Sequence, residues 1–469
     1  MGKNKHWVLL ANWYDRTHLR GVMSYEMSGR LGMWYCESVW VELYYNGEYC
    51  GLYQLCESIR VDEERVDIFD WEEAAEAVAS LCAEDYGLSQ RKEEALARQL
   101  TYDLSWVTKG TNGTYDLSEY IDALDLTIDG GYLIENDSYN DEPSRFTTEN
   151  GVMYMVTAPN TLAESRDMFR WVQNYFQSVE DAIFSPTRRN GNGDHYADLM
   201  DMDSFADYWF VNEFFKNGEI LFKSTFLSLD RGGKLTWGPV WDMDWAGGNH
   251  VNLGEGGQNP AGWVHGGGER QVWSRSLFTD PYCVLLLYER FDDTVRSAMD
   301  AALADLEIYA AGLQTAADLD NGRWKYPDTF AEEIDLYRTW LTGRREWMTA
   351  QFASPETLLK SLKMYTPSEV MTVTGGTLTG NTLTLTMALS DGAADFAEVF
   401  VNGVSCGTVP LTEVLTVPVP ERAGETTAAY DAVEVLGCRA EGDYRIVQQR
   451  GGTDGCDIRE SGCIFIPKH

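Results

Sequence analysis

Apolar and polar residues alternate along two stretches near the start of the chain, 39–45 and 49–59. The pair Asn46-Gly47 between them is typical of a tight β-hairpin turn, in which both central residues adopt positive φ. Residues 131–136 have the apolar character of a buried strand, and 145–156 form a second hairpin-like pair. The pattern predicts antiparallel strands in the first half of the chain.

Other stretches are predicted to be helical. Residues 70–104 are mostly acidic and helix-forming, which predicts a solvated helical insertion rather than an acidic binding tail. Residues 295–311 and 330–347 predict two long helices. We therefore expect the first 365 residues to form an α+β fold with a helical C-terminal portion.

The composition changes near residue 365. Every tryptophan lies at or before Trp347, and no lysine occurs between Lys363 and Lys468. Residues 372–387 alternate β-branched and small residues between Gly-Gly and Gly-Asn pairs, which predicts short strands. We expect 366–469 to form a separate, sandwich-like β domain, for which a structural role is favoured over ligand binding or surface attachment.

Charge and cysteine content narrow the function classes. The 469 residues contain 74 Asp and Glu against 37 Lys and Arg, a formal net charge of −37. That balance excludes a protein held to nucleic acid by charge, because phosphate groups need cationic neutralisation. No apolar run reaches the roughly 18 residues of a membrane span, and we expect no secretory signal at the start. The nine cysteines form no CxxC pair, although the four after position 400 could form two disulfides in an exported protein.

The segment 201–249 is the strongest candidate for chemistry. It opens with a predicted helix that is capped by Asp201 and stopped at Asn217-Gly218. Glu213 falls in the middle of the apolar face of this helix, where an acid must be paired or perturbed. Two alternatives are equally weighted: satisfaction by a buried arginine or backbone N–H groups, or a supporting role in an active site.

Two acids follow this helix at the end of a predicted strand pair. The pattern predicts strands over 220–229 and from Lys234 onward, the second ending at 241–245. In extended chain Asp242 and Asp244 would point to one side, a pair of hard oxygen ligands suited to Mg²⁺ or Mn²⁺. A metal site is favoured over a surface turn because two Trp and a Met accompany the acids. The glycine-rich loop of 247–268 matches no P-loop or dinucleotide fingerprint, and a metal-dependent hydrolase or two-carboxylate glycosidase stays possible.

Several blocks together resemble the CotH family of spore coat proteins, which are atypical, protein-kinase-like phosphotransferases. The resemblance covers residues 3–355 and leaves the β domain outside. Its matching blocks are 5–19 (KHWVLLANWYDRTHL), 39–59 (VWVELYYNGEYCGLYQLCESI), 130–137 (GGYLIEND) and, above all, 212–249.

The resemblance implies a kinase-like core that transfers the γ-phosphoryl group of ATP, with Mg²⁺ or Mn²⁺, to Ser or Thr. The family's metal-binding Asp falls on Asp242, with Asp244 as its neighbour and Ser224 where ordinary kinases have a metal-binding Asn. The catalytic acid of the Asn-x-Asp pattern falls on Glu219, so Glu replaces Asp there. Arg20 and Glu57 are the candidates for the nucleotide pocket.

The resemblance also carries expectations about the whole protein. Family members have a segment resembling RGNSxW and Lys-rich strands before the strand at 7–11, and this sequence lacks them. We therefore expect the kinase-like domain, 1–365, to be N-terminally incomplete. The implied substrates are basic, Ser-rich proteins of the spore coat or cell surface, where the protein itself is expected. The alternative hypothesis is a non-catalytic surface, adhesion or coat-assembly module of the same family.

Overall fold

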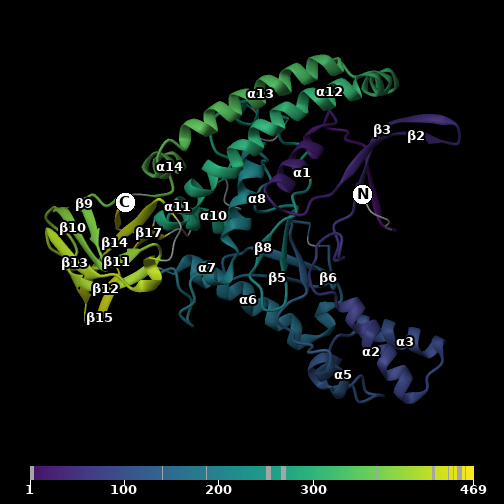
Figure 1. Ribbon diagram of the computed structural model, residues 1–469, viewed down its shortest axis with the longest axis horizontal. Helices are drawn as coiled ribbons and strands as arrows, with labels where there is room; N and C mark the ends of the chain where they lie inside the picture. The colour runs from purple at the N-terminus through teal and green to yellow at the C-terminus, as the bar shows by residue number, and fades with distance from the viewer. Residues whose placement is uncertain are drawn as a thin grey trace. The chain divides into compact units, whose positions relative to one another are not determined.

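The computed structural model has a mixed α+β architecture, which confirms the class predicted from the sequence (Figure 1). The described residues are 5–139, 141–185, 187–249, 255–265, 271–365, 367–424, 428–441, 443–446, 448–450, 457–459 and 461–468. They divide into two compact units. The first comprises 1–178, 198–264 and 297–345, and the second comprises 179–197, 265–296 and 346–469.

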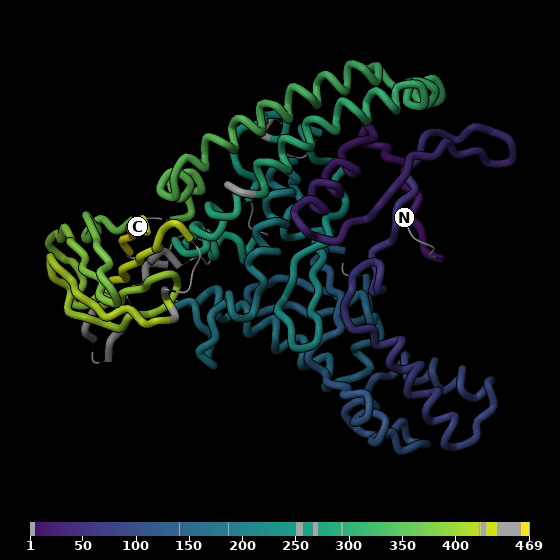
Figure 2. Tube along the Cα trace, in the orientation of Figure 1, coloured from purple at the N-terminus to yellow at the C-terminus, as the bar shows by residue number. Residues whose placement is uncertain are grey.

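A three-stranded antiparallel sheet opens the first unit. Its spatial order is β1-β3-β2, with the strands β1 (Trp7–Leu10), β2 (Ser38–Tyr45) and β3 (Glu48–Glu57). Asn46 and Gly47 join β2 to β3 with φ values of 50° and 84°, which confirms the predicted hairpin. In Figure 2 the hairpin of β2 and β3 is the purple loop that projects past the N-terminus.

A second sheet lies at the centre of the first unit. Its order is β5-β6-β4-β7-β8, with the strands β4 (Tyr132–Asn136), β5 (Arg145–Thr147), β6 (Met153–Ala158), β7 (Thr225–Leu229) and β8 (Thr236–Trp237). The strands predicted at 131–136 and 145–156 are confirmed. Because Asn136 pairs with Thr225, the chain leaves β4 beside the point where it enters β7. That junction positions the candidate site.

Helices make up most of the rest of the first unit. The predicted insertion is confirmed as α2 (Trp71–Tyr86) and α3 (Gln90–Tyr102), where the Asp70 side chain caps α2 by accepting from the backbone of Glu72 and Glu73. The other helices before the site are α1 (Arg20–Arg30), α4 (Trp106–Lys109), α5 (Ser118–Ala123), α6 (Arg166–Phe184), α7 (Tyr196–Leu199) and α8 (Met202–Phe214).

The two long predicted helices are also confirmed, and both extend beyond their predicted ends. They are α12 (Arg296–Trp324) and α13 (Phe330–Gln351), which run side by side in Figures 1 and 2. Arg345 on α13 bonds Asp300 on α12 through its Nε atom at 2.8 Å. Shorter helices before them are α9 (Glu255–Gln258), α10 (Val272–Leu277) and α11 (Pro281–Arg290).

The end of the predicted helix in 201–249 differs from the sequence prediction. Asp201 caps α8 as expected, accepting from the backbone of Asp203 and Ser204. The helix ends at Phe214, and Lys216, with φ of 52°, takes the left-handed conformation that the sequence assigned to Gly218. The buried hydrogen bonds of the Lys216 side chain hold this unfavourable backbone conformation.

The two strands predicted after this helix were too long. Strand β7 begins only at Thr225, because Leu221 and Ser224 have φ values of 64° and 46° that no extended strand accommodates. Strand β8 has only two residues, and Asp242 has φ of 58°. The sequence analysis explained the placement of Asp242 and Asp244 by an extended strand over 241–245. That explanation was wrong.

Strands make up much of the second unit. One sheet has the order β13-β10-β9, and another has β12-β11-β14-β15 with β18 paired to β14. The two share one apolar core that includes Met371, Leu385, Val399 and Val433. The strands are β9 (Met371–Thr379), β10 (Thr382–Leu389), β11 (Phe396–Val401), β12 (Val404–Pro410), β13 (Val414–Pro418), β14 (Tyr430–Glu441), β15 (Asp443–Ile446), β16 (Gln448–Arg450), β17 (Asp457–Arg459) and β18 (Ser461–Pro467).

Two predictions about this part of the chain have different outcomes. The domain boundary near residue 365 stays a prediction. The two disulfides considered for an exported protein are not formed among the described residues, where Cys406, Cys438 and Cys463 are free thiols. Cys456 lies outside the described residues.

Candidate active site

The candidate site forms where β4 ends and β7 begins. The Ser224 hydroxyl donates to Oδ2 of Asp242 at 3.3 Å, so two of the predicted metal ligands lie together. The backbone N–H of Ser224 donates to Oδ2 of Asp137 at 3.4 Å. Asp137 follows β4 and is 6% exposed, and the sequence analysis did not select it. Asp137 could have been selected from the sequence because it stands at the end of a predicted buried strand, in the block GGYLIEND.

Carboxylates crowd around this pair. Burial, followed by the charges of Asp137 and other acids including Asp242, raises the pKa of Glu135 to about 7. Burial, followed by the charge of Asp242, likewise raises the pKa of Asp244 to about 7. Acids that disfavour one another's ionised form are relieved by a bound cation. The oxygen donors here therefore fit a hard divalent metal ion.

A divalent ion at this place would need further ligands besides these side chains. Across the described ranges, no three His, Cys, Asp or Glu side chains meet as a ready metal cluster. Mg²⁺ is commonly held by one or two carboxylates together with substrate phosphates. The geometry suits that shared mode of binding better than a closed protein cage.

Glu219 is held by Lys223, four residues further along the chain. Lys223 Nζ donates to Oε1 of Glu219 at 2.9 Å, and it lies 5.2 Å and 5.8 Å from the ring centroids of Tyr139 and Trp245. Burial alone would lower the pKa of Lys223, but the bond and charge of Glu219 raise it above its usual value. The site thus contains a charged ammonium group among its carboxylates.

Asn217 connects the loop of Glu219 to the loop of Asp242. Its side-chain oxygen accepts from the backbone N–H of Glu219 at 3.1 Å. Its side-chain nitrogen donates to Oδ1 of Asn212 at 2.9 Å and to the sulfur of Met243 at 3.2 Å. The sequence analysis named Asn217 only as part of a pattern and missed this positioning role, which depends on a contact across 26 residues.

Arg20 lies beneath the loop that follows Asp244. Its guanidinium pairs with Asp15 and donates to the backbone oxygens of Ala246 at 3.0 Å and Gly247 at 3.3 Å. Gly247 has φ of 58°, and a Cβ there would lie 2.5 Å from the Tyr337 ring, so only glycine fits. In this structure Arg20 holds the loop, and a contact with nucleotide stays a prediction.

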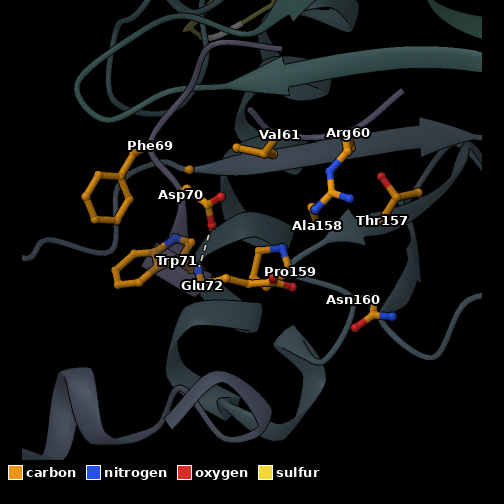
Figure 3. A pocket seen from close by; sticks show the side chains of 11 residues that line it. Arg60, Val61, Phe69, Asp70, Trp71, Glu72, Thr157, Ala158, Pro159 and Asn160 are labelled. Atoms are coloured by element: carbon orange, nitrogen blue, oxygen red, sulfur yellow. Dashed lines mark hydrogen bonds between the residues drawn. The ribbon is translucent and has the colours of Figure 1, made fainter. Parts of the chain in front are cut away.

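Glu57 ends β3 and is 5% exposed, and its Oε2 atom accepts from the backbone N–H of Glu37 at 3.2 Å. Arg60, three residues after Glu57 in the chain, lines a cavity of about 170 Å³. In Figure 3 the Arg60 guanidinium is directed toward Thr157 and Ala158. Neither Arg20 nor Glu57 lines this cavity. The assignment of Glu57 to a nucleotide pocket therefore also stays a prediction.

Glu213 is satisfied in the way the first alternative predicted. Arg344 on α13 donates to Oε2 of Glu213 at 3.0 Å, and the backbone N–H of Val264 donates to both carboxylate oxygens at 3.1 Å. Both charged side chains are 0% exposed. Glu213 is thus a structural anchor for α8 and the chain around Val264.

We expect Lys216 to give a distinctive pH dependence of stability. Its Nζ atom donates to the backbone oxygens of Asn259 and Ala261 at 2.7 Å each, and burial, with the nearby Arg344, lowers its pKa to about 8. Between about pH 8 and 10.5, the ordinary pKa of a lysine, the folded state therefore binds fewer protons at this site than the unfolded chain. Its contribution to the free energy of unfolding should increase with pH across this window.

Urea unfolding of the parent and of Lys216→Met at intervals from pH 7 to 10.5 measures this contribution. The difference in unfolding free energy between parent and variant should grow in favour of the parent as pH rises. A constant difference across the window would contradict the lowered pKa.

Comparison with protein-family models gives a match that covers the segments forming the candidate site. The family model of the CotH kinase protein matches residues 1–348. The chain belongs to the CotH family. The match includes every element of the candidate site and confirms the resemblance seen in the sequence blocks. A search of curated proteins gave no match.

Membership of the CotH family is consistent with a spore coat protein. Within the part of the chain that the structure describes, no helix combines the length and apolar character required to cross a bilayer. The site just described lies wholly in the first unit, and all of its residues precede the end of the family match.

Proposed function

We propose that this CotH protein has a protein-kinase-like core and transfers the γ-phosphoryl group of ATP to Ser or Thr of spore coat or cell-surface proteins. The main support for this proposal is the 3.3 Å hydrogen bond between the side chains of Ser224 and Asp242, beside the buried Asp137. These side chains come from three separate parts of the chain. Asp242 is also close enough to Lys223, the partner of Glu219, for its charge to help raise the pKa of Lys223.

In this proposal the residues divide their roles by chemistry. Asp242 and Ser224 would hold Mg²⁺ or Mn²⁺, with Asp244 beside them. A bound ATP–metal complex supplies the phosphoryl group and neutralises its charge, so the protein's task is mainly positioning. Glu219 would orient the hydroxyl of the substrate and accept its proton. Glutamate provides the same carboxylate as aspartate, one methylene further from the backbone.

Lys223 and Asn217 would support Glu219 in this role. Lys223 holds one carboxylate oxygen, and Asn217 holds the backbone N–H of the same residue. A residue held at both its carboxylate and its backbone loses little entropy when it meets the substrate hydroxyl. The cation on Lys223 would also stabilise negative charge that develops on a transferring phosphoryl group.

The charge of the chain supports a basic protein substrate. A groove of about 650 Å³ between the start of α2 and the turn before β8 has one basic lining residue, Arg231, and six acidic ones: Asp62, Glu63, Asp67, Asp70, Glu73 and Asp230. Its floor includes the apolar side chains of Val61 and Leu126. Opposite charge increases both the rate and the specificity of protein association. A basic, Ser-rich segment matches this surface better than an acidic one.

The proposal is tested by following transfer of labelled phosphate from ATP to a basic, Ser-rich protein in the presence of Mg²⁺. Glu219→Gln should lower kcat by about 100-fold or more, because a positioned acid–base group contributes about that much. Glu84→Gln on the exposed face of α2 is the matched control and should leave the rate unchanged. Equal rates for parent and Glu219→Gln would refute the catalytic role of Glu219.

A non-catalytic surface or coat-assembly module is the second candidate function. It is favoured by the residue at position 219, where Glu replaces the Asp of the family pattern. The carboxylate of Glu219 is already paired with Lys223. This candidate function predicts no Mg²⁺-dependent labelling by the parent chain, and partner binding that survives EDTA and Asp242→Asn alike.

A further inference from the structure

An apolar groove in the second unit has no place in the proposed reaction. Its cavity volume is about 610 Å³. It lies between the helix α14 (Pro355–Leu362) and the strands β9 and β18. Apolar side chains line most of it, including Leu359, Met371, Val373 and Phe465. Concave, mainly apolar cavities of ~300–1,000 Å³ are typical of small-molecule sites.

The groove opens at the seam between the two sheets of this unit. Strand β9 belongs to one sheet and β18 to the other. Just before β9, the backbone N–H of Ser368 donates to the backbone oxygen of Ser461 at the start of β18, at 2.8 Å. A Cβ at Gly462 would lie 3.2 Å from Val373, so the strands approach closely there. Met371 and Val373 also belong to the shared core. A hydrocarbon chain in the groove would therefore continue that core.

Two lysines stand at this groove in a strongly acidic chain. The second unit has only three lysines in its sequence, and two of them, Lys360 and Lys363, line the groove. Among the described residues neither lysine side chain forms a hydrogen bond or an ion pair, whereas the side chain of Lys468 lies 3.4 Å from Asp431. Glu356, one turn before Lys360 on α14, also lines the groove.

Apart from Glu356, the polar groups inside the groove carry no negative charge. The Tyr365 hydroxyl accepts from the Ser461 hydroxyl at 3.1 Å. Burial, opposed by the bond from Tyr365, raises the pKa of the Cys463 thiol to about 12, so the thiol stays neutral at physiological pH. Beyond the lysines and Glu356, the lining therefore offers an apolar surface with few polar groups.

We propose that this groove binds a long-chain carboxylate, with its hydrocarbon chain between α14 and strands β9 and β18 and its carboxylate at Lys360 and Lys363. The apolar lining recognises the chain, and the two unpaired ammonium groups recognise the anionic head. An uncharged apolar molecule would use only the first of these interactions. An extended apolar peptide would require strand pairing along β9 and would use neither lysine.

Displacement of the fluorescent probe 1-anilinonaphthalene-8-sulfonate from the full chain measures this binding. Saturated carboxylates of eight to fourteen carbons should displace the probe with affinity that rises about fourfold per added CH₂, the value expected for burying one methylene. The alcohol of the same length should bind more weakly. Absence of displacement, or affinity independent of chain length, would overturn the proposal.

Two variants distinguish the contribution of the ligand's carboxylate head from that of its hydrocarbon chain. Lys360→Glu combined with Lys363→Glu should weaken carboxylate binding by about tenfold and leave alcohol binding unchanged. Lys92→Glu combined with Lys325→Glu changes the net charge equally at exposed positions elsewhere and should have no effect. Thr372→Trp narrows the groove from an exposed position on β9 and should weaken carboxylate and alcohol alike.

Circular dichroism of each variant verifies the fold. Equal carboxylate affinity in the parent and the Lys360→Glu, Lys363→Glu variant would remove the head-group assignment and overturn the proposal. Displacement by an apolar peptide but by no carboxylate would assign the groove to strand addition instead. Neither result depends on phosphoryl transfer, so this proposal and the kinase proposal fail independently.

Discussion

Asp242→Asn is expected to reduce Mg²⁺-dependent phosphate transfer by at least about 100-fold, the cost of removing one group that stabilises transition-state charge. The substitution keeps the size of the side chain and its acceptor for the Ser224 hydroxyl. It removes one negative charge from a set of carboxylates that raise one another's pKa. Transfer from labelled ATP to a basic, Ser-rich protein measures the loss.

A matched aspartate controls for general effects of the same substitution. Asp122→Asn, on the exposed surface of α5, should leave transfer unchanged. Titration of Mg²⁺ or Mn²⁺ distinguishes the cause, because loss of a metal ligand raises the metal concentration required for half-maximal rate. Full activity of Asp242→Asn at the parent's metal requirement would contradict the assignment of Asp242.

Arg344→Met is expected to destabilise the fold by about 3–5 kcal/mol, because it leaves the carboxylate of Glu213 buried without its charged partner. Arg344 also donates to the backbone oxygens of Glu213 and Gly262 at 2.6 Å each, so the same change removes those two hydrogen bonds as well. Chemical unfolding followed by tryptophan fluorescence measures the free energy difference.

The neighbouring arginine on α13 is the control. Arg345 bonds Asp300 at 2.8 Å, but the two side chains are 34% and 50% exposed. Arg345→Met should therefore cost no more than about 1 kcal/mol, the value of an exposed ion pair. The double variant Glu213→Leu, Arg344→Met should be more stable than Arg344→Met alone. Equal losses for Arg344→Met and Arg345→Met would contradict the buried-pair interpretation.

Local sequence rules predicted those parts of the fold that depend on neighbouring residues. The turn at Asn46-Gly47 and the caps by Asp70 and Asp201 each need only a few adjacent residues to form their bonds. The long helices α12 and α13 were visible for the same reason, since helical periodicity repeats over many turns. Family membership was readable from several blocks taken together.

The same rules failed around the candidate site. Leu221, Ser224 and Asp242 all have positive φ, which an apolar or β-rich pattern does not reveal. Such conformations are held by contacts distant in sequence, such as the bond from the Ser224 backbone to Asp137. The family resemblance had assigned Asp242 and Ser224 to one site, and the two side chains are hydrogen-bonded. The strand geometry that paired Asp242 with Asp244 was wrong, because Asp242 has a positive φ.

The sequence by itself determined the residue chemistry, the α+β class, the local turns and caps, and the family to which this chain belongs. Only the tertiary structure decided which of the 74 acids meet. It placed Asp137 beside Ser224, gave Glu213 its partner Arg344, and set Arg20 beneath the loop after Asp244. These contacts join residues that are 87, 131 and 226 positions apart, and they arise from the packing of whole elements rather than from any local pattern.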